Sequence, residues 1–527
     1  MTKNPNTTSD QTQHFDLIVI GSGAGNIVVD AALSAGKSVA LIEKGYWGGT
    51  CLNRGCIPTK ILLTPADRLR EWKLNQKIGL KGDMPTLDWS VAAARMKNMV
   101  SGNRQGVEDY YGGFDNCSLF HGTATFTGKK ALAVTLDNGS TVSLTADRFV
   151  IAAGGRSKVP SIAGLDEVGA LTTETFFDDK FPKKLYESIT LIGGADIGAE
   201  FAHLFAAYGC KVNVVQHNVR LVPKQDEDVS AKVLEQFRAD GINVVLNKDT
   251  TRVEIVDGKK RLHFKDRATG EEEYVDSEEI IISAGIAPYT DLLKPEKAGV
   301  ELDRRGWIRT NEYLETTAPD IYAIGDINGQ LQLRHKANYE AEILSWNLYT
   351  RHMLPEKRPL RVVRYDVVPS ATFTHPQVGR VGLTEAQAKD AGYNIYVSKF
   401  NFSEVVKAYA MGIDADTTED GFVKLIVDQE TDRMLGMHIV GPEASILVQG
   451  AAYLMNAGEQ PHKIVNEDIE HEMAAAGRAG NYEKYIDPRT REGIAHAMTI
   501  HPALMEVVGW SHNPITGQIL EKGKQNK

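Results

Sequence analysis

Two cysteines stand close together in a short segment that is rich in glycine. Cys51 and Cys56 belong to GGTCLNRGCIPTK at residues 48–60, and the 527-residue chain contains only four cysteines. Their C-x-x-x-x-C spacing differs from the C-x-x-C hook of zinc sites, and no second pair completes a tetrahedron, so we expect no metal. Two neighbouring thiols can instead exchange an electron pair by cycling between dithiol and disulfide.

The segment before the cysteines has the pattern of a nucleotide-binding unit. An apolar run at 15–20 (FDLIVI) is followed by GSGAGN at 21–26, a helix-like stretch and a second apolar run at 38–44 (SVALIEK). Strand, glycine turn, helix and strand in this order are typical of a dinucleotide-binding βαβ unit. A glycine pattern alone would also fit a turn of no function, but the elements around it favour a nucleotide site.

Three residues of this unit suit such a site. Gly21 allows a tight turn, and Gly23 lets backbone N–H groups approach a pyrophosphate at the helix N-terminus. Glu43 ends the second strand, where its carboxylate can accept hydrogen bonds from a ribose. Because Asn26 stands where a third glycine is usual, we expect the helix to pack slightly farther from the strand.

The same arrangement recurs at 188–217 (SITLIGGADIGAEFAHLFAAYGCKVNVVQH), and Gly193 and Gly198 keep two glycines of the turn. Recurrence within one chain predicts two dinucleotide domains, which suits an enzyme that passes electrons between two cofactors.

This second copy departs from the pattern at three positions. Ala195 takes the place of the middle glycine, where its methyl group would crowd a phosphate. Asp196 adds a negative charge beside the same phosphate, and Gln216 replaces the carboxylate at the strand end.

Three further apolar runs end in small residues: 149–155 (FVIAAGG), 280–288 (IIISAGIAP) and 321–329 (IYAIGDING). Asp326 follows the last run, where it can bind a flavin's ribityl or phosphate region or simply cap a loop. From about residue 360 onward, strand-like and helix-like segments alternate, which indicates a separate α+β domain.

The composition narrows the class of protein. Hydrophobic residues make up 42% and charged residues 24%, as in a globular protein, and no apolar run of about 18 residues predicts a membrane span. The net charge of −10 and the lack of a basic cluster argue against nucleic-acid binding. Four cysteines cannot form a disulfide framework, so we expect the reducing cytoplasm. Residues 1–14 have the character of a polar tail.

The cysteine segment resembles the active-site signature of the class I pyridine nucleotide–disulfide oxidoreductases. This family includes dihydrolipoyl dehydrogenase and the glutathione, trypanothione, mycothione and mercuric reductases. The likeness covers roughly residues 15–510 and includes both glycine turns, IAAGG, IYAIGD, FTHPQVGRVGLTE at 373–385 and IHPALMEVV at 500–508.

The resemblance implies a glutathione reductase-like α/β fold with two Rossmann-like domains and a C-terminal α+β dimerisation domain. We expect an FAD-binding domain at 15–160 and 287–355, an NAD(P)-binding domain at 161–286 and an interface domain at 360–527. It also implies a homodimer, in which the partner subunit completes each active site.

The resemblance further implies roles for the reactive side chains. Cys51 attacks the substrate sulfur, and Cys56 lies against the flavin as a charge-transfer thiolate. Because a free thiol titrates near about 8.5, the attacking thiolate needs a base, which the resemblance places at His501 with Glu506 to orient it. HPxxxE alone would also fit an ordinary helix start, and His496 is a nearby rival that lacks the proline and the spaced glutamate.

Lys60 and Glu200 match two further family positions, as an ion pair between flavin and nicotinamide, although both would also fit ordinary surface charges. His335 begins a helix whose positive end, the resemblance implies, points at the flavin pyrimidine. The expected cofactor contacts are, for FAD, Gly21, Gly23, Gly25, Glu43, Lys44, Gly49, Thr50, Lys60, Ala153, Gly154, Asp326 and His335, and, for the nicotinamide coenzyme, Gly193, Gly198, Gln216 and Gly285.

The resemblance implies that the substrate is a small thiol or disulfide, or a lipoyl-carrier protein. CLNRGCIP favours dihydrolipoamide, whereas Asn26, HKANYEAE and IHPALMEVV look more like mycothione reductase. Mercuric reductases typically carry extra cysteines near the C-terminus, but the last cysteine here is Cys210. Cys117 and Cys210 are better explained as small buried residues.

The choice between NAD and NADP stays open, because Gln216 is neither acidic nor basic and His217 and Arg220 offer only weak basicity. The usual G-R-x-P-N is GIAPY at 285–289. We therefore expect nicotinamide to bind more weakly or in a different pose. A flavin redox-binding partner with a decayed nicotinamide site is the alternative to an enzyme.

The segment at 477–499 is polar and about 20–25 residues longer than in relatives, so it is an inserted loop. It either screens substrates at the mouth of the active site or is a surface excursion without function.

Overall fold

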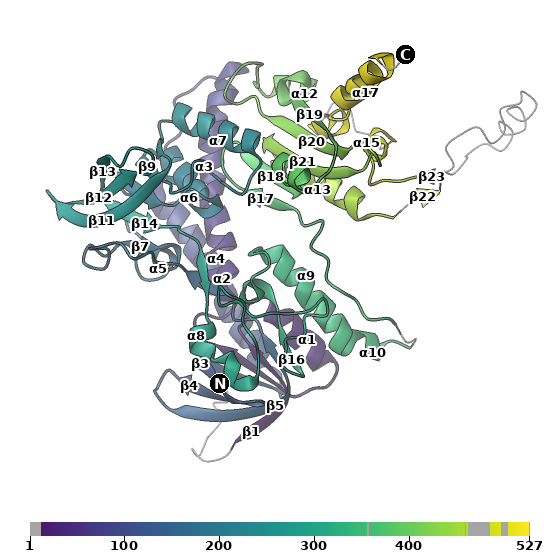
Figure 1. Cartoon of the computed structure of the whole chain (residues 1–527). Helices are drawn as coiled ribbons and strands as arrows, with labels where there is room; N and C mark the ends of the chain where they lie inside the picture. The colour runs from purple at the N-terminus through teal and green to yellow at the C-terminus, as the bar shows by residue number, and fades with distance from the viewer. Residues whose placement is uncertain (1–11, 356–357, 459, 462–484, 497–503, 526–527) are drawn as a thin grey trace, which may run out of the picture.

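The computed structural model describes residues 12–355, 358–458, 460–461, 485–496 and 504–525. Three sheets of five or six strands, with helices packed against them, organise this part of the chain (Figure 1). The α/β fold class with two nucleotide-type sheets and a C-terminal α+β unit is confirmed. Among the described residues, no helix combines the length and the apolar character that a membrane crossing requires.

The first sheet is a parallel sheet in the order β3-β2-β1-β5-β16, with β4 pairing antiparallel to the extended ends of β3 and β5. Its strands are β1 (Gln13–Ile20), β2 (Val39–Glu43), β3 (Cys117–Gly128), β4 (Ala131–Leu136), β5 (Thr141–Ile151) and β16 (Ile321–Ala323).

Strand β1 is buried on both faces, which explains its unbroken apolar run. Leu17 and Val19 pack with helices α1 (Gly25–Ser34) and α9 (Arg334–Ser345), whereas Ile18 packs toward β4.

The second sheet is entirely parallel, in the order β10-β9-β8-β14-β7. Its strands are β7 (Leu171–Thr172), β8 (Ser188–Ile192), β9 (Lys211–Val215), β10 (Asn243–Val245) and β14 (Glu279–Ile282). Helix α6 (Asp196–Ala207) follows β8, and α7 (Glu227–Ala239) follows β9. An antiparallel sheet of β11 (Lys248–Val256), β12 (Lys259–Asp266) and β13 (Glu272–Ser277) is attached to this unit.

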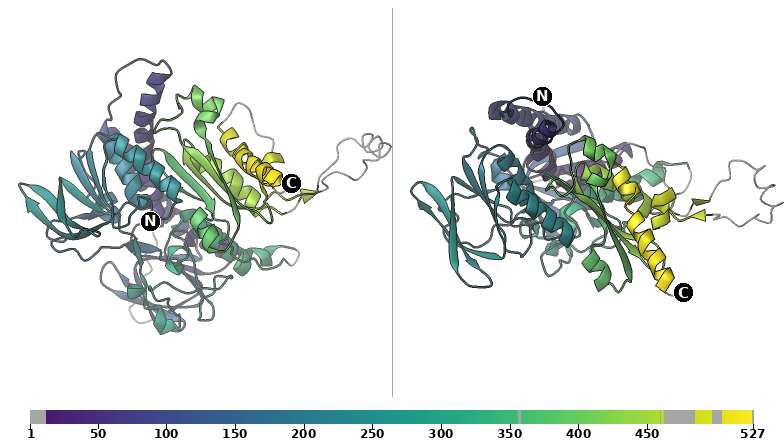
Figure 2. Two further views of the ribbon diagram at one scale, coloured as in Figure 1. Left: turned by 45° about the horizontal axis from the view of Figure 1, so that its top comes forward. Right: turned by 90° about the horizontal axis from the view of Figure 1, so that it is seen from above.

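The third sheet is antiparallel, in the order β17-β18-β21-β20-β19. Its strands are β17 (Ser370–Thr372), β18 (Gln377–Gly382), β19 (Ile395–Asn401), β20 (Phe422–Asp428) and β21 (Met434–Gly441). Helix α13 (Ala444–Asn456) packs on β18 and β21. In both views of Figure 2, the teal second unit and the yellow-green third unit lie on opposite sides of the molecule.

Two long helices connect the first unit to the second. Helix α3 (Cys56–Lys77) starts at the second cysteine and packs against α4 (Trp89–Gly112) and α6. Its apolar residues Leu62, Leu63 and Ala66 belong to the same buried cluster as Phe201 and Phe205 of α6. The helix that begins at Cys56 is therefore fixed by the core of the second unit.

The remaining elements are short or peripheral. They are α2 (Gly49–Asn53), β6 (Gly155–Ser157), α5 (Thr173–Phe177), β15 (Ile286–Pro288), α8 (Thr290–Leu293), α10 (Arg351–Met353), α11 (Glu385–Asp390), α12 (Val406–Ala410), β22 (Gln460–Pro461), β23 (Tyr485–Ile486), α15 (Arg491–His496), α16 (Glu506–Gly509) and α17 (Asn513–Gln525). Strands β6 and β15 pair where the chain passes between the first two units. The three sheets fall within the predicted domain ranges except that β1 begins at Gln13, inside the predicted tail at 1–14. The domain boundaries stay predictions.

Candidate active site

The cysteine pair lies at the junction of two helices. Cys51 is in the short helix α2, and Cys56 is the first residue of α3. A side chain at Gly55 would bring its Cβ to 3.2 Å from the Thr50 carbonyl oxygen, so the chain folds back closely between the two cysteines. The structure describes both as thiols, and a hydrogen bond joins their side chains.

The ionisation of each thiol depends on the other. The hydrogen bond with Cys56 lowers the pKa of Cys51 to about 7 against the opposing effect of burial, and the positive charges of Arg334 and Lys60 contribute. The same hydrogen bond and burial raise the pKa of Cys56. Because a thiolate is the nucleophile in thiol–disulfide exchange, one sulfur of the pair is ready to react at physiological pH.

An ion pair lies one turn beyond Cys56. The Lys60 Nζ donates to Glu200 Oε2 at 2.6 Å, and the other oxygen of Glu200 accepts from the Phe373 backbone N–H at 2.9 Å. The Lys60 ammonium also lies 4.2 Å from the centre of the Phe373 ring. Since these residues come from α3, α6 and the third unit, all three units meet here, and Glu200 is only 8% exposed.

A second polar contact joins the same two helices two turns farther along. His203 Nε2 lies 2.9 Å from Asp67 Oδ1, and its ring stacks on His375 at 6.0 Å between centres. Burial lowers the pKa of His203 to about 3 and that of His375 to about 4, and it raises the pKa of Asp67 to about 6. Sequence reasoning missed this group, although Asp196, Glu200 and His203 form a polar stripe at helical spacing on an otherwise apolar helix.

The first glycine turn forms a cradle without side chains. A Cβ on Gly21 would lie 2.3 Å from the Ala152 carbonyl oxygen, which places the segment with Ala153 and Gly154 against the turn. A Cβ on Gly49 would lie 2.8 Å from the Cα of Gly23. This bare surface at the N-terminus of α1 fits a diphosphate, which needs close backbone approach and a positive helix end.

The expected wider spacing of α1 is wrong, because Gly25 provides the close contact that Asn26 does not. A Cβ on Gly25 would lie 2.7 Å from Val19 Cγ1 on the neighbouring strand. The helix and the strand are therefore in contact one residue earlier than the usual pattern predicts.

Glu43 braces the first turn from the end of β2. One carboxylate oxygen accepts from the Ser22 backbone N–H at 2.9 Å and from its hydroxyl at 2.7 Å, and the other accepts from the Gly45 N–H at 2.8 Å. An ionised carboxylate has about four acceptor sites, so one remains for a ribose hydroxyl. Lys44, next along the chain, lies over the ring of Tyr289 at 4.7 Å from its centre.

The start of α9 faces the same cradle. Arg334, which sequence reasoning missed, is its first residue, and its Nη1 lies 3.5 Å from the position of a Cβ on Gly23. His335 is exposed and contacts the Pro369 carbonyl oxygen at 2.7 Å. Asp326 is half-buried beside this helix start, and desolvation raises its pKa to about 6.

The second glycine turn repeats the backbone geometry of the first. A Cβ on Gly193 would lie 2.6 Å from the Ser283 carbonyl oxygen, and one on Gly198 would lie 2.0 Å from the Gly193 carbonyl oxygen. Asp196 accepts from the Thr372 hydroxyl at 2.7 Å and from the Gln225 amide at 3.3 Å. Its carboxylate is therefore tied to the third unit.

Gln216 is 3% exposed, and both ends of its amide are engaged within the chain. Its oxygen accepts from the Gly194 N–H at 3.0 Å, and its nitrogen donates to the Arg220 carbonyl at 3.2 Å. Gly285 has a positive φ of 98°, and its carbonyl accepts from the Lys158 N–H at 2.8 Å.

The predicted base His501 lies outside the described residues, as do 477–484 and 497–499 of the predicted insertion, whereas its described part at 485–496 contains β23 and α15. Its predicted partner Glu506 is described: it is 1% exposed and begins α16. In the described ranges, no group of three or more histidine, cysteine, aspartate or glutamate side chains could hold a metal ion.

Comparison with known proteins agrees with this geometry. The family model described as "Pyridine nucleotide-disulphide oxidoreductase" matches residues 15–341, and its dimerisation domain matches residues 368–472. The chain belongs to this family. Pyridine nucleotide–disulfide oxidoreductases use FAD and NAD(P).

Several individual relatives are similar over most of their length. Dihydrolipoyl dehydrogenase of Mycobacterium tuberculosis is 32% identical over 438 residues, which cover 82% of this chain and 90% of the relative. That of Corynebacterium glutamicum is 30% identical over 515 residues, which cover 97% and 99%. A mercuric reductase of Lysinibacillus sphaericus is 34% identical over 468 residues, which cover 88% and 80%.

A solved structure supports the fold. The HOCl-induced flavoprotein disulfide reductase RclA from Escherichia coli superposes with a TM-score of 0.72 at 26% identity, covering 93% of this chain and 98% of that one. This chain is thus a flavin-dependent disulfide oxidoreductase of the same general type as these relatives.

Proposed function

We propose that this protein exchanges an electron pair between dihydrolipoamide and a nicotinamide coenzyme, through the thiol pair Cys51–Cys56 and FAD. The observation that carries the proposal is the hydrogen-bonded thiol pair, with the pKa of Cys51 at about 7, one turn from the Lys60–Glu200 ion pair. The dihydrolipoyl dehydrogenases among the relatives favour this substrate over other small disulfides.

The thiol pair performs the exchange in two steps. A substrate thiolate attacks Cys51 of the oxidised pair, the Cys51–Cys56 bond breaks, and Cys56 leaves as a thiolate. The second substrate sulfur then displaces Cys51, so the substrate becomes a cyclic disulfide and the pair becomes one thiol and one thiolate. Of the two protons released, one remains shared by the pair and the other passes to a base.

His501 is the proposed base, oriented by Glu506. Histidine suits the role because its ordinary pKa lies close to that of Cys51. We place it in the partner subunit of a homodimer, which is supported by the match to the family's dimerisation domain.

FAD, when bound in the cradle of Gly21, Gly23 and Gly49, supplies the two-electron carrier between the thiols and the coenzyme. Lys60 and Glu200 hold a fixed charge pair between the first two units. Since Glu200 is also tied to the Phe373 backbone, the Lys60 ammonium is held in one place beside the thiol helix.

The proposal is tested by mixing the purified protein with dihydrolipoamide and NAD⁺ or NADP⁺ and following reduced coenzyme. We expect turnover by the wild type and by Cys117→Ser, and only background turnover by Cys51→Ser and by Cys56→Ser. The Cys117→Ser variant is the matched control, because Cys117 is the other cysteine of the first sheet unit. Turnover by Cys51→Ser would reject the thiol pair, and a flavin-loaded protein inactive with dihydrolipoamide would reject this substrate.

A further inference from the structure

The residue at the end of β9 acts as a brace within the chain. Gln216 accepts from the Gly194 N–H and donates to the Arg220 carbonyl with the same side chain. An amide can do both, whereas an ionised carboxylate has no hydrogen to donate. The glutamine is therefore explained by the loop that it holds, and it leaves no carboxylate here to accept a hydrogen bond from a ribose 2′-hydroxyl.

The loop that follows Gln216 is fixed at several points. The Val222 N–H donates to the Gly194 carbonyl at 2.8 Å, and the Gln225 amide donates to Asp196 and to the Thr372 hydroxyl, both at 3.3 Å. The loop is therefore tied back to the second glycine turn and to the third unit.

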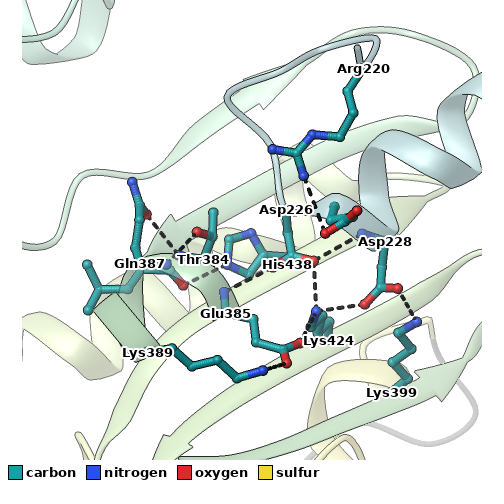
Figure 3. Close-up of polar contacts among 12 residues, drawn as sticks. Arg220, Asp226, Asp228, Thr384, Glu385, Gln387, Lys389, Lys399, Lys424 and His438 are labelled. Atoms are coloured by element: carbon teal, nitrogen blue, oxygen red, sulfur yellow. Dashed lines mark hydrogen bonds and ion pairs between the residues drawn. The ribbon is translucent and has the colours of Figure 1, made fainter. Parts of the chain in front are cut away.

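The loop ends at a buried ion cluster. Asp226, at the start of α7, binds the Lys424 ammonium of β20 at 2.8 Å, and Asp228 and Glu385 also bind it, each at 2.6 Å (Figure 3). Because Lys424 is 1% exposed, this end of the loop cannot shift without uncovering a charge. In Figure 3, the guanidinium of Arg220 lies above the ion cluster, on the loop whose end the cluster holds.

Two arginines and a histidine surround the strand end. Arg220 is 40% exposed, and its contact with Glu227 is long at 3.6 Å. Arg267 is 41% exposed, lies 3.5 Å from Asp249 and donates to the His217 carbonyl at 3.5 Å. The His217 ring binds Asp249 at 2.8 Å. Exposed pairs of this kind contribute little, so a phosphate can replace Glu227 as the partner of Arg220.

From this geometry we infer that the coenzyme is NADP(H) rather than NAD(H), with Arg220 as the ligand of the adenosine 2′-phosphate and Arg267 beside it. An acidic strand end favours NAD and a nearby arginine favours NADP. Here Gln216 takes the place of the acid, and both ends of its amide are already hydrogen-bonded within the chain. Because Arg220 lies on a fixed loop, the loop needs little ordering when the coenzyme binds. The inference rests on the proposed function only in placing the nicotinamide coenzyme at the second glycine turn.

Equilibrium binding of 2′,5′-ADP and of 5′-AMP to the flavin-loaded protein tests the inference without turnover. The two probes differ only in the 2′-phosphate. We expect 2′,5′-ADP to bind at least about tenfold more tightly, as for a contact between a guanidinium and a phosphate, and more weakly as salt is raised. In Arg220→Gln the ratio should fall to about one to three.

Arg238→Gln is the matched control, because it removes the same charge from an exposed position of α7 in the same unit. It should leave the ratio unchanged. Equal binding of the two probes by the wild type would overturn the inference, as would a preference that survives in Arg220→Gln. If the preference is found but dihydrolipoamide is not oxidised, the substrate proposal fails and the coenzyme assignment stands.

Discussion

The two glycine turns share one backbone device and differ in the side chains around it. In each turn, the first glycine lies against a backbone carbonyl at the end of a neighbouring parallel strand. The carbonyl belongs to Ala152 for Gly21 and to Ser283 for Gly193. The first turn has no side chain at Gly23, and the Glu43 carboxylate holds it through hydrogen bonds to Ser22. The second has Ala195 in the corresponding place and is braced by the buried amide of Gln216. The shared turn therefore predicts a nucleotide at both places, and the residues that brace it differ between the two.

The cysteines of the two units differ in how readily they ionise. The pKa of Cys51 is lowered to about 7, whereas burial raises that of Cys210 to about 12, and its Sγ donates to the Tyr186 carbonyl at 2.8 Å. At neutral pH, about half of Cys51 is thiolate, compared with about one part in 10⁵ of Cys210.

Alkylation of the reduced protein by iodoacetamide should therefore modify Cys51 and spare Cys210. Since only the thiolate reacts, the rate should fall about tenfold per pH unit below about 7 and level off above it. Peptide mass spectrometry across pH measures this difference. A half-maximal rate near the ordinary thiol value of about 8.5 would contradict the lowered pKa.

Gly49→Ala is expected to cost the first turn its cofactor. The added Cβ would lie 2.8 Å from the Gly23 Cα, in a backbone conformation with φ of +70°. The affinity for flavin should fall about 100-fold, because strain and crowding each cost about 1–2 kcal/mol. The flavin content per chain, read from absorbance, measures this loss.

Gly36→Ala separates these two costs. Gly36 has a φ of +71°, but a Cβ there would meet nothing within 4 Å. It carries the strain without touching the cradle, so flavin should remain bound. Equal flavin loss in both variants would show that the cradle contact is not the cause.

Glu43→Gln replaces the carboxylate that holds the first turn by an amide, the group that holds the second turn at Gln216. The carboxylate accepts from three donors on Ser22 and Gly45, but an amide has one oxygen and would turn its NH₂ toward a donor. Flavin affinity should fall about tenfold, as expected for about 1.4 kcal/mol. The temperature at which flavin leaves the protein, followed by its fluorescence, measures the change. Glu301→Gln is the control, because Glu301 is exposed. Unchanged flavin release would show that the charge of Glu43 is not needed.

Sequence patterns were sufficient where the residues that make a feature are neighbours in the chain. The strands and helices around both turns and the fold class follow from apolar runs and glycine spacing. Gly25 shows the limit even there, because its contact with Val19 depends on how the helix crosses the strand. The spacing of residues along the chain does not specify the angle at which the helix crosses the strand.

Contacts across long separations could not be predicted in the same way. His203 and Asp67 are 136 positions apart, and nothing local marks either as a partner of the other. Gln216 was expected to touch the coenzyme because of its place at a strand end, but its bonds depend on the path of the loop to Arg220. Arg334 was overlooked because its role depends on facing Gly23 from a distant helix.

Asp196→Asn tests the smallest difference between the two turns, the extra negative charge at the start of α6. Asparagine keeps an oxygen that can accept from the Thr372 hydroxyl and the Gln225 amide, so the contacts with the third unit should survive. Removing a like charge near the coenzyme phosphates should lower the KM for the coenzyme about two- to threefold, since a charge at a helix end is worth about 0.3–1 kcal/mol. The gain should shrink as salt is raised, because this interaction is partly screened. A KM that rises instead would mean that the carboxylate serves the coenzyme site through its bond to Thr372, and that its charge is held away from the phosphates.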